Sequence, residues 1–189
     1  MQQEFLKTFL EHLEATGSLY VVTGSVASNF WGIPRLTHDV DVVVVLSLNQ
    51  VSQVTAAFSS DRYYVSESAI REAVRDGRMF NVIDSRTGDK ADLWVASGNA
   101  FNQDMLQRRR RVDLLPGVSA FVGSPEDVLL HKLVWHTITP SERQLADAAG
   151  IAAVQAGNLD LLYLREWAAK QGTSQLLEDA LKGKGLKST

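Results

Sequence analysis

The stretch that most constrains the fold is Asp39-Val-Asp-Val-Val-Val-Val-Leu46, which is almost entirely valine beyond its third residue. β-Branched residues favour strands, and a nearly continuous apolar run is typical of a strand that is covered on both faces. We therefore predict a buried strand over residues 39–46 that is polar only where it begins. Such a strand requires an α/β core built around it.

Two carboxylates, Asp39 and Asp41, stand at the start of this strand. Side chains alternate along a strand, so both point to the same face, roughly 6–7 Å apart. Like charges at that distance repel unless a cation lies between them. Magnesium binds a few carboxylate oxygens together with waters and substrate phosphates. The pair therefore predicts a divalent-cation site.

A second feature, Gly24-Ser25, follows an apolar run and precedes a short helical pattern over residues 25–32. Glycine allows a ligand to approach the backbone closely, and the first N–H groups of a helix bind anions. Ser25 can also cap the helix, which is compatible with phosphate contact. A phosphate-binding turn beside metal-holding carboxylates indicates chemistry on a nucleoside triphosphate.

Together these residues resemble the signature of the nucleotidyltransferase superfamily, whose fold is that of DNA polymerase β. In its small intracellular branch, which includes the nucleotidyltransferase toxins of abortive-infection (type IV toxin–antitoxin) systems, the pattern is Gly-(Gly/Ser)-x-Ala, then Arg-x-Thr-x-Asp-hydrophobic-Asp. The matching residues here are Gly24, Ser25, Ala27, Arg35, Thr37, Asp39 and Asp41. The resemblance implies an α+β (α/β) fold in which a mixed β-sheet with flanking helices precedes a C-terminal helical bundle.

Residues 79–96 predict a β-hairpin whose connection contains Gly88. Its second strand carries Asp92 among apolar residues, and the superfamily has its third metal-site carboxylate on such a neighbouring strand. Asp92 is therefore our candidate, both as a metal ligand and as the base that accepts the proton of an incoming hydroxyl. Asp84, on the first strand, is the rival. Asp92 also has a structural alternative, as a surface charge paired with Lys90 or Arg86.

The C-terminal third is expected to be helical. Ser124-Pro125 followed by two acids predicts the start of a helix over residues 125–138. Lys132 and Asp147 resemble the lysine that reaches the triphosphate, and the helical aspartate near the nucleotide, in the toxin-like branch. Lys132 could instead extend from an amphipathic helix into solvent, and Arg35 could pair with an acid rather than a phosphate. We divide the chain into 1–123 and 124–189.

Other elements are predicted from hydrophobic periodicity and turn residues. They are helices over 2–16, 48–60, 67–76, 141–156, 159–171 and 174–182, and strands over 18–23, 112–115 and 118–122. Arg108 to Arg111 form a basic run that could contact RNA phosphate, bind the nucleotide or lie in a solvated loop.

Composition narrows the functional classes. The chain of 189 residues has no cysteine, which excludes disulfides, thiolate catalysis and cysteine–zinc sites. Its net charge of −3 gives no global reason to expect nucleic-acid binding. The N-terminal residues lack a signal-peptide pattern and no apolar run reaches membrane-spanning length, so we expect a cytoplasmic protein without a membrane partner.

The resemblance implies transfer of a nucleoside monophosphate from a triphosphate to a hydroxyl of tRNA or protein. Two Mg²⁺ ions (Mn²⁺ is the alternative ion) would be held by Asp39, Asp41 and Asp92. The nucleotide would be bound by Gly24, Ser25, Arg35, Thr37, Lys132 and Asp147. The setting would be a toxin restrained by an antitoxin partner. The alternatives are an antibiotic-modifying enzyme of the aminoglycoside-adenylyltransferase kind and a non-catalytic nucleotide-binding or interaction module.

Overall fold

A computed structural model describes residues 3–96 and 98–185. The chain forms two compact units. The first unit comprises the chain up to Thr23 together with Leu36–Val122, and the second comprises Gly24–Arg35 together with the chain from Gly123. The second unit resumes close to the boundary expected after residue 123, but it also includes residues 24–35. This segment joins it because its buried side chains pack against helices of the C-terminal region.

The first unit contains a mixed seven-stranded sheet in the order β3-β4-β5-β2-β1-β7-β6. β2 lies in the middle, antiparallel to β1 and parallel to β5, and β1 is parallel to β7. The mixed sheet predicted from the sequence is confirmed. The strands are β1 (Leu19–Thr23), β2 (Asp39–Val45), β3 (Tyr63–Tyr64), β4 (Met79–Asp84), β5 (Lys90–Val95), β6 (Arg110–Leu115) and β7 (Val118–Val122).

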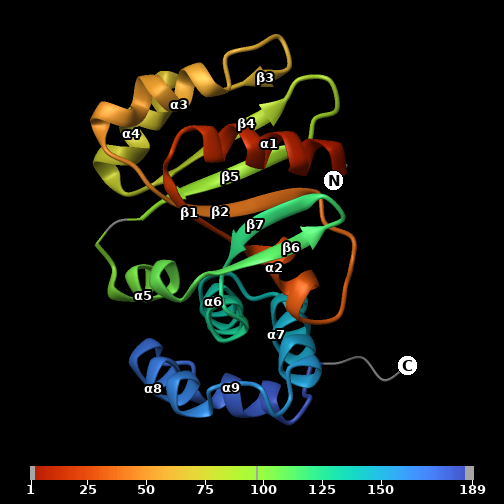
Figure 1. The fold of residues 1–189 in the computed structure, drawn as a ribbon. Helices are drawn as coiled ribbons and strands as arrows, with labels where there is room; N and C mark the ends of the chain where they lie inside the picture. The colour runs from red at the N-terminus through yellow and green to blue at the C-terminus, as the bar shows by residue number, and fades with distance from the viewer. Residues whose placement is uncertain (1–2, 97, 186–189) are drawn as a thin grey trace. The chain divides into compact units, whose positions relative to one another are not determined.

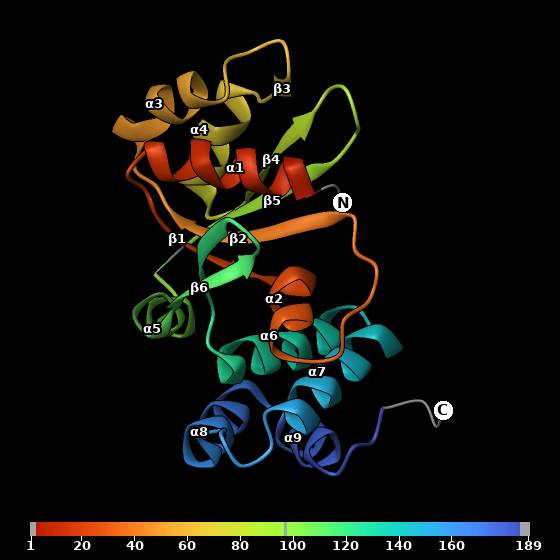
Figure 2. The ribbon, with the colours of Figure 1, turned by 45° about the vertical axis from the view of Figure 1, so that its right-hand side comes forward.

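Burial along β2 follows its sequence except at the far end, where the strand stops at Val45 and that residue is exposed rather than covered. Val40, Val42 and Val44 are fully buried, whereas Asp39 and Asp41 alternate with them and are only half-buried. Helices cover both faces of the sheet: α1, α3 and α4 lie on one side and α5 on the other (Figures 1 and 2). These helices are α1 (Gln3–Ala15), α3 (Val51–Ala57), α4 (Glu67–Asp76) and α5 (Ala100–Arg108).

Three local predictions differ from the structure. α5 was not predicted, although its buried residues Met105 and Leu106 pack against Val21 and Val43 of the sheet and Asn99 caps it. β6 begins at Arg110 instead of residue 112, because its pairing with β7 extends through two of the arginines. The helix expected over residues 48–60 is a 3₁₀ turn, Leu48–Gln50, followed by the shorter α3.

The second unit is helical, as predicted for the C-terminal part. Its helices are α2 (Gly24–Trp31), α6 (Pro125–Ile138), α7 (Glu142–Val154), α8 (Leu161–Gln171) and α9 (Ser174–Leu181). α6 packs against α7 and α8, and α2 packs against α6 and α7. The α2–α7 contact requires glycine at position 32, because a Cβ there would lie 2.8 Å from the backbone nitrogen of Ile151.

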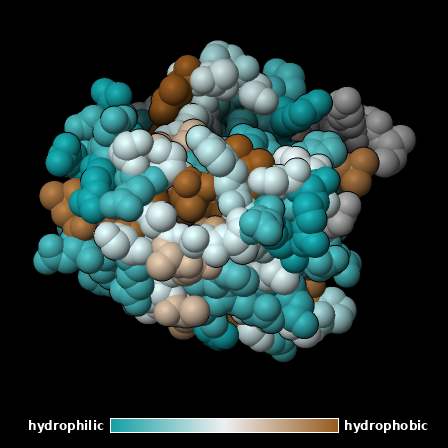
Figure 3. Space-filling model, turned by 90° about the horizontal axis from the view of Figure 1, so that it is seen from above, coloured by the Kyte–Doolittle hydropathy of each residue, from teal (hydrophilic) through white to brown (hydrophobic). Residues whose placement is uncertain are grey.

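The described surface has a mainly polar character in the view from above, where apolar side chains form small separate groups (Figure 3). Over residues 3–96 and 98–185, no helix combines the length and the apolar character needed to cross a bilayer.

Candidate functional site

The three predicted metal-site acids occupy neighbouring positions in the sheet of the first unit. In the parallel β2–β5 pair, Asp41 is the register partner of Asp92, and Asp39 is the partner of Lys90. In both strands these residues alternate with fully buried apolar ones, so all four side chains belong to the same face. The structure therefore places Asp39, Asp41 and Asp92 together on one face of two adjacent strands.

An ammonium group lies among these carboxylates. Lys90 Nζ is 3.0 Å from Asp92 Oδ2 and 3.6 Å from Asp39 Oδ2. Burial lowers the pKa of Lys90, but the hydrogen bond to Asp92 and the charges of Asp92 and Asp39 outweigh it, so the net shift is upward. Asn81 also donates a side-chain hydrogen bond to Asp92. The sequence predicts a bound cation on this face of the strands. In the structure, the Lys90 ammonium group supplies a positive charge there.

The donor set suits Mg²⁺, which is usually bound through one or two carboxylates and otherwise keeps water and phosphate ligands. Within the two described ranges, no group of three or more His, Asp or Glu side chains is arranged to hold a metal ion. A magnesium ion here would therefore take oxygens from Asp39, Asp41 and Asp92 only as Lys90 moves away, and would complete its shell from water and substrate.

This competition gives a first prediction. The Lys90→Met variant should bind Mg²⁺ about two- to fivefold more tightly, because a half-exposed cation that opposes the ion is worth up to about 1 kcal/mol. Isothermal titration with Mg²⁺ measures the effect. Arg86→Met is the matched control, since it also removes one exposed cation from the hairpin, but one whose partner is Asp84. Equal Mg²⁺ affinity in wild type and Lys90→Met would contradict the placement of the ion.

The rival acid, Asp84, has a different environment. Its side chain is fully buried at the end of β4, where Arg62 Nε donates to Asp84 Oδ2 at 2.7 Å. Burial alone would raise the pKa of Asp84, but the hydrogen bond from Arg62 lowers it below its usual value. Asp84 aligns with Tyr63 of the outermost strand β3, not with β2. Asp92, rather than Asp84, is therefore the acid beside Asp41.

The second unit contains the Gly24-Ser25 turn. Gly24 has a φ of 61°, in the left-handed region that favours glycine, and α2 begins there. Ser25 lies in the first turn of α2, where its hydroxyl accepts hydrogen bonds from two cations. Arg35 Nη2 donates to Ser25 Oγ at 2.7 Å, and Lys132 Nζ donates to the same oxygen at 3.4 Å. The predicted phosphate-binding turn thus carries a basic cluster.

Asp147 joins these cations to each other. Arg35 donates to both of its oxygens, from Nε at 2.7 Å and from Nη2 at 2.8 Å, and Lys132 Nζ lies 2.7 Å from Oδ2. The Lys132 and Asp147 side chains are each only 4% exposed, so this ion pair is buried. Burial would raise the pKa of Asp147, but the hydrogen bond from Arg35 and the charge of Lys132 lower it. One carboxylate thus holds both cations beside Ser25.

Five of the six predicted nucleotide-binding residues therefore belong to the second unit, and four of them form this cluster. Thr37 belongs to the first unit, where its hydroxyl donates to the backbone oxygen of Asp39 at 3.4 Å. Arg35 does pair with an acid, as one alternative proposed, and Lys132 is buried rather than extended into solvent. A helix start with two cations beside it is suited to hold a phosphate group.

Two supporting residues were not predicted. Asn29 holds the Arg35 backbone through two hydrogen bonds, from Arg35 N–H to Oδ1 at 3.0 Å and from Nδ2 to the Arg35 oxygen at 2.7 Å. Ser28 donates to Asp147 Oδ2 at 3.4 Å. Ser25, Ser28 and Asn29 are spaced as i, i+3 and i+4, so the polar face of α2 was a usable signal in the sequence.

Comparison with known proteins supports the architecture. No protein-family model and no curated protein matches the sequence. Among solved structures, the antibiotic-resistance factor ANT(2'')-Ia is similar with a TM-score of 0.59 at 7% identity, over 93% of this chain and 97% of that one. An antigenic nucleotidyltransferase-like protein from Paracoccidioides brasiliensis has a TM-score of 0.56 at 19% identity, over 100% and 96%. JHP933 from Helicobacter pylori has a TM-score of 0.52 at 12% identity, over 96% and 87%. These similarities show that the chain has a nucleotidyltransferase-like fold.

Proposed function

We propose that this protein is a magnesium-dependent nucleotidyltransferase that moves a nucleoside monophosphate from a triphosphate to a hydroxyl group. One observation carries the proposal: Asp41 and Asp92 are register partners, and Asp39 stands on the same face with a cation already held among the acids. The nucleotidyltransferase-like fold supports it. Lys90 pairs with Asp92, as the structural alternative for that acid proposed, and also with Asp39.

In the proposed reaction the acceptor oxygen bonds to the α-phosphorus as the bond to the bridging oxygen breaks, and pyrophosphate leaves. Bound Mg²⁺ would neutralise charge on the phosphate oxygens. Asp39, Asp41 and Asp92 supply its carboxylate oxygens, and Asp92 accepts the proton of the acceptor hydroxyl. Catalysis then consists mainly of positioning and charge stabilisation.

Nucleotide binding is assigned to Gly24, Ser25, Arg35, Thr37 and Lys132. The α2 N-terminus and the two cations of the basic cluster attract the triphosphate. Asp147 acts through the cations: it fixes Arg35 in a bidentate geometry and keeps Lys132 charged in a buried position.

For the acceptor we propose tRNA or a protein, with the protein acting in the cytoplasm as a toxin that an antitoxin partner restrains, as the sequence resemblance implies. A second candidate is a small-molecule acceptor. It is favoured by the similarity to ANT(2'')-Ia, an antibiotic-resistance factor that matches this chain over nearly its whole length.

The testing experiment supplies each α-labelled triphosphate with Mg²⁺ to the protein and three separate acceptor pools: total tRNA, cell-extract protein and an aminoglycoside mixture. We expect label in one pool, released pyrophosphate in equal amount, and loss of both when a chelator removes the metal. Label in the aminoglycoside pool alone would establish the second candidate. Triphosphate binding without label in any pool would indicate the non-catalytic module, and the proposed reaction would be wrong.

A further inference from the structure

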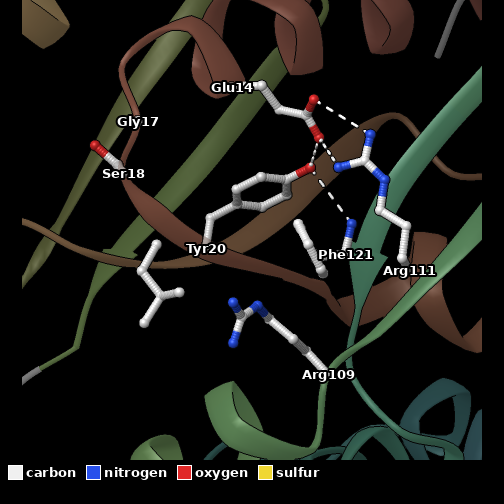
Figure 4. A pocket seen from close by; sticks show the side chains of 8 residues that line it. Glu14, Gly17, Ser18, Tyr20, Arg109, Arg111 and Phe121 are labelled. Carbon is white, nitrogen blue, oxygen red and sulfur yellow. Dashed lines mark hydrogen bonds and ion pairs between the residues drawn. The ribbon is translucent and has the colours of Figure 1, made fainter.

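A cavity in the first unit lies at the start of β1 and takes no part in the proposed reaction. It has a volume of about 230 Å³, and its lining includes Leu19, Tyr20, Arg109 and Phe121. Figure 4 shows the Arg109 guanidinium reaching into this space beneath the Tyr20 ring, whereas Arg111 reaches toward Glu14. Both arginines line this cavity and stack over Phe121, but only Arg111 has a carboxylate partner among the described residues.

Arg111 is neutralised within the protein. Its Nη1 lies 2.7 Å from Glu14 Oε1, and the Tyr20 hydroxyl donates to the same carboxylate at 2.7 Å. Burial and this hydrogen bond raise the pKa of Tyr20, so its hydroxyl stays protonated and continues to donate. Glu14 is fully engaged by these two partners. It therefore does not compensate the charge of Arg109.

Arg109 has no carboxylate partner among the described residues. Its guanidinium stacks over Phe121 with 4.7 Å from Cζ to the ring centroid, and Nη1 donates to the backbone oxygen of Leu106. Its Nε is buried and has no hydrogen-bond acceptor within the described residues. An unsatisfied buried donor is costly, and more so when it is charged. A guanidinium stacked on a ring offers its free edge to a planar oxyanion.

Arg109 also borders a second space, whose lining combines apolar side chains with the amides of Asn99, Gln103 and Gln107. A second cavity of about 280 Å³ shares Arg109 and Leu19 with the first and is also lined by Val45, Ala96 and Leu106. Leu19 is 42% exposed, which is unusual for an apolar residue that begins a buried strand. The Arg109 guanidinium therefore lies between the Phe121 ring and the apolar side chains of the second cavity. Ligand pockets typically combine an apolar lining with a few placed polar groups in this way.

The register of the sheet separates these cavities from the acids. Leu19 pairs with Val45 at one end of the β1–β2 ladder, and Thr23 pairs with Asp41 at the other. Four residues of strand correspond to about 13 Å. Occupancy of the Arg109 cavities is therefore independent of the proposed metal site, and of whether the proposed transfer reaction is correct.

We propose that Arg109 binds the carboxylate or phosphate group of a small organic anion whose apolar body lies against Leu19, Val45 and Leu106. The oxyanion accepts hydrogen bonds from the part of the guanidinium that lines the cavities, whereas the buried Nε–H lies out of its reach. Such charge-assisted, bidentate contacts are the strong class of hydrogen bond. Arg109 thereby gives one member of the basic run a role that needs no nucleic acid.

The experiment titrates the full-length protein with benzoate and, separately, with phenyl phosphate, while NMR follows the Arg109 Nε–H and the Leu19 methyl signals. Benzyl alcohol is the neutral control, and acetate and inorganic phosphate test the head groups without the ring. We expect at least one aromatic anion to bind about tenfold more tightly than benzyl alcohol and to shift both signals. The tighter of the two anions identifies the head group.

Arg109→Lys keeps the charge but removes the planar fork, and should weaken that binding about tenfold. Arg111→Lys is the matched control and should change it by less than about twofold, because Arg111 is committed to Glu14. Equal affinity for benzyl alcohol, equal effects of the two variants, or shifts confined to Ser25 and Lys132 would each overturn the proposal. So would response of these signals to a short RNA but to neither aromatic anion, which would instead make the basic run a nucleic-acid contact.

Discussion

Nucleotidyl transfer is expected to fall by on the order of a thousandfold when Asp41 is replaced by asparagine, because a carboxylate that holds the metal contributes several kcal/mol of charge stabilisation. The change removes one negative charge and preserves the shape of the side chain. Label transfer from an α-labelled triphosphate, measured at saturating Mg²⁺, gives the rate. Binding of the triphosphate without metal should change little.

Asp61→Asn is the control for this prediction, because Asp61 is an exposed aspartate in the same unit. It should retain the wild-type rate. The pair Asp92→Asn and Asp84→Asn separates the two candidates for the third acid: Asp92→Asn should lower the rate as Asp41→Asn does. Asp84→Asn should lower stability instead, because it weakens a fully buried partner of Arg62. A full rate in Asp41→Asn would refute the proposed chemistry.

The largest loss of stability is expected from Asp147→Asn, at about 3–5 kcal/mol, because the buried Lys132 ammonium loses the carboxylate that neutralises it. Denaturant unfolding followed by circular dichroism gives the free energy of unfolding. Asp179→Asn is the matched control in the same unit and should lower the free energy of unfolding far less, since Asp179 pairs with the exposed Lys184. Adding Lys132→Met to Asp147→Asn should recover part of the loss, and equal destabilisation by the single and double variants would contradict the assignment.

The same residue predicts an acid dependence. The pKa of Asp147 is lower in the folded protein than in the unfolded chain, so its contribution to stability is present above about pH 4. That contribution is lost as the pH falls through the folded-state pKa, because protonation removes the charge that holds Arg35 and Lys132. Unfolding curves measured between pH 7 and pH 2 should therefore show a smaller decline for Asp147→Asn than for wild type.

Much of the first unit could be predicted, because the hydrophobic and turn residues of each segment favour the same secondary structure that the segment adopts in the fold. The valines of β2 and the glycine of the β4–β5 hairpin predicted their elements directly. α5 was missed because its sequence carries only three core residues, next to a run of arginines whose charge argued for a loop. β3 has only two residues, which is too few to produce a pattern.

The site shows a different limit. The sequence predicted that Lys90 and Asp92 lie on one face of their strand. It did not predict the ion pair between Lys90 and Asp39, because that contact depends on how β2 and β5 pair. The basic cluster depends on still more distant partners. Arg35 and Asp147 are 112 residues apart, and only the resemblance to known proteins, not local periodicity, brought them into one prediction.

The position of α2 in the sequence has a consequence for biosynthesis. Residues 24–35 are translated early, yet the groups that complete their basic cluster, Lys132 and Asp147, follow Ser25 and Arg35 by 107 and 112 residues. A nascent chain that has emerged only through β7 already carries every acid of the sheet but has no partner for Arg35 on α6 or α7. The basic cluster around Ser25 is therefore completed late in synthesis, after all the strands of the sheet have been made.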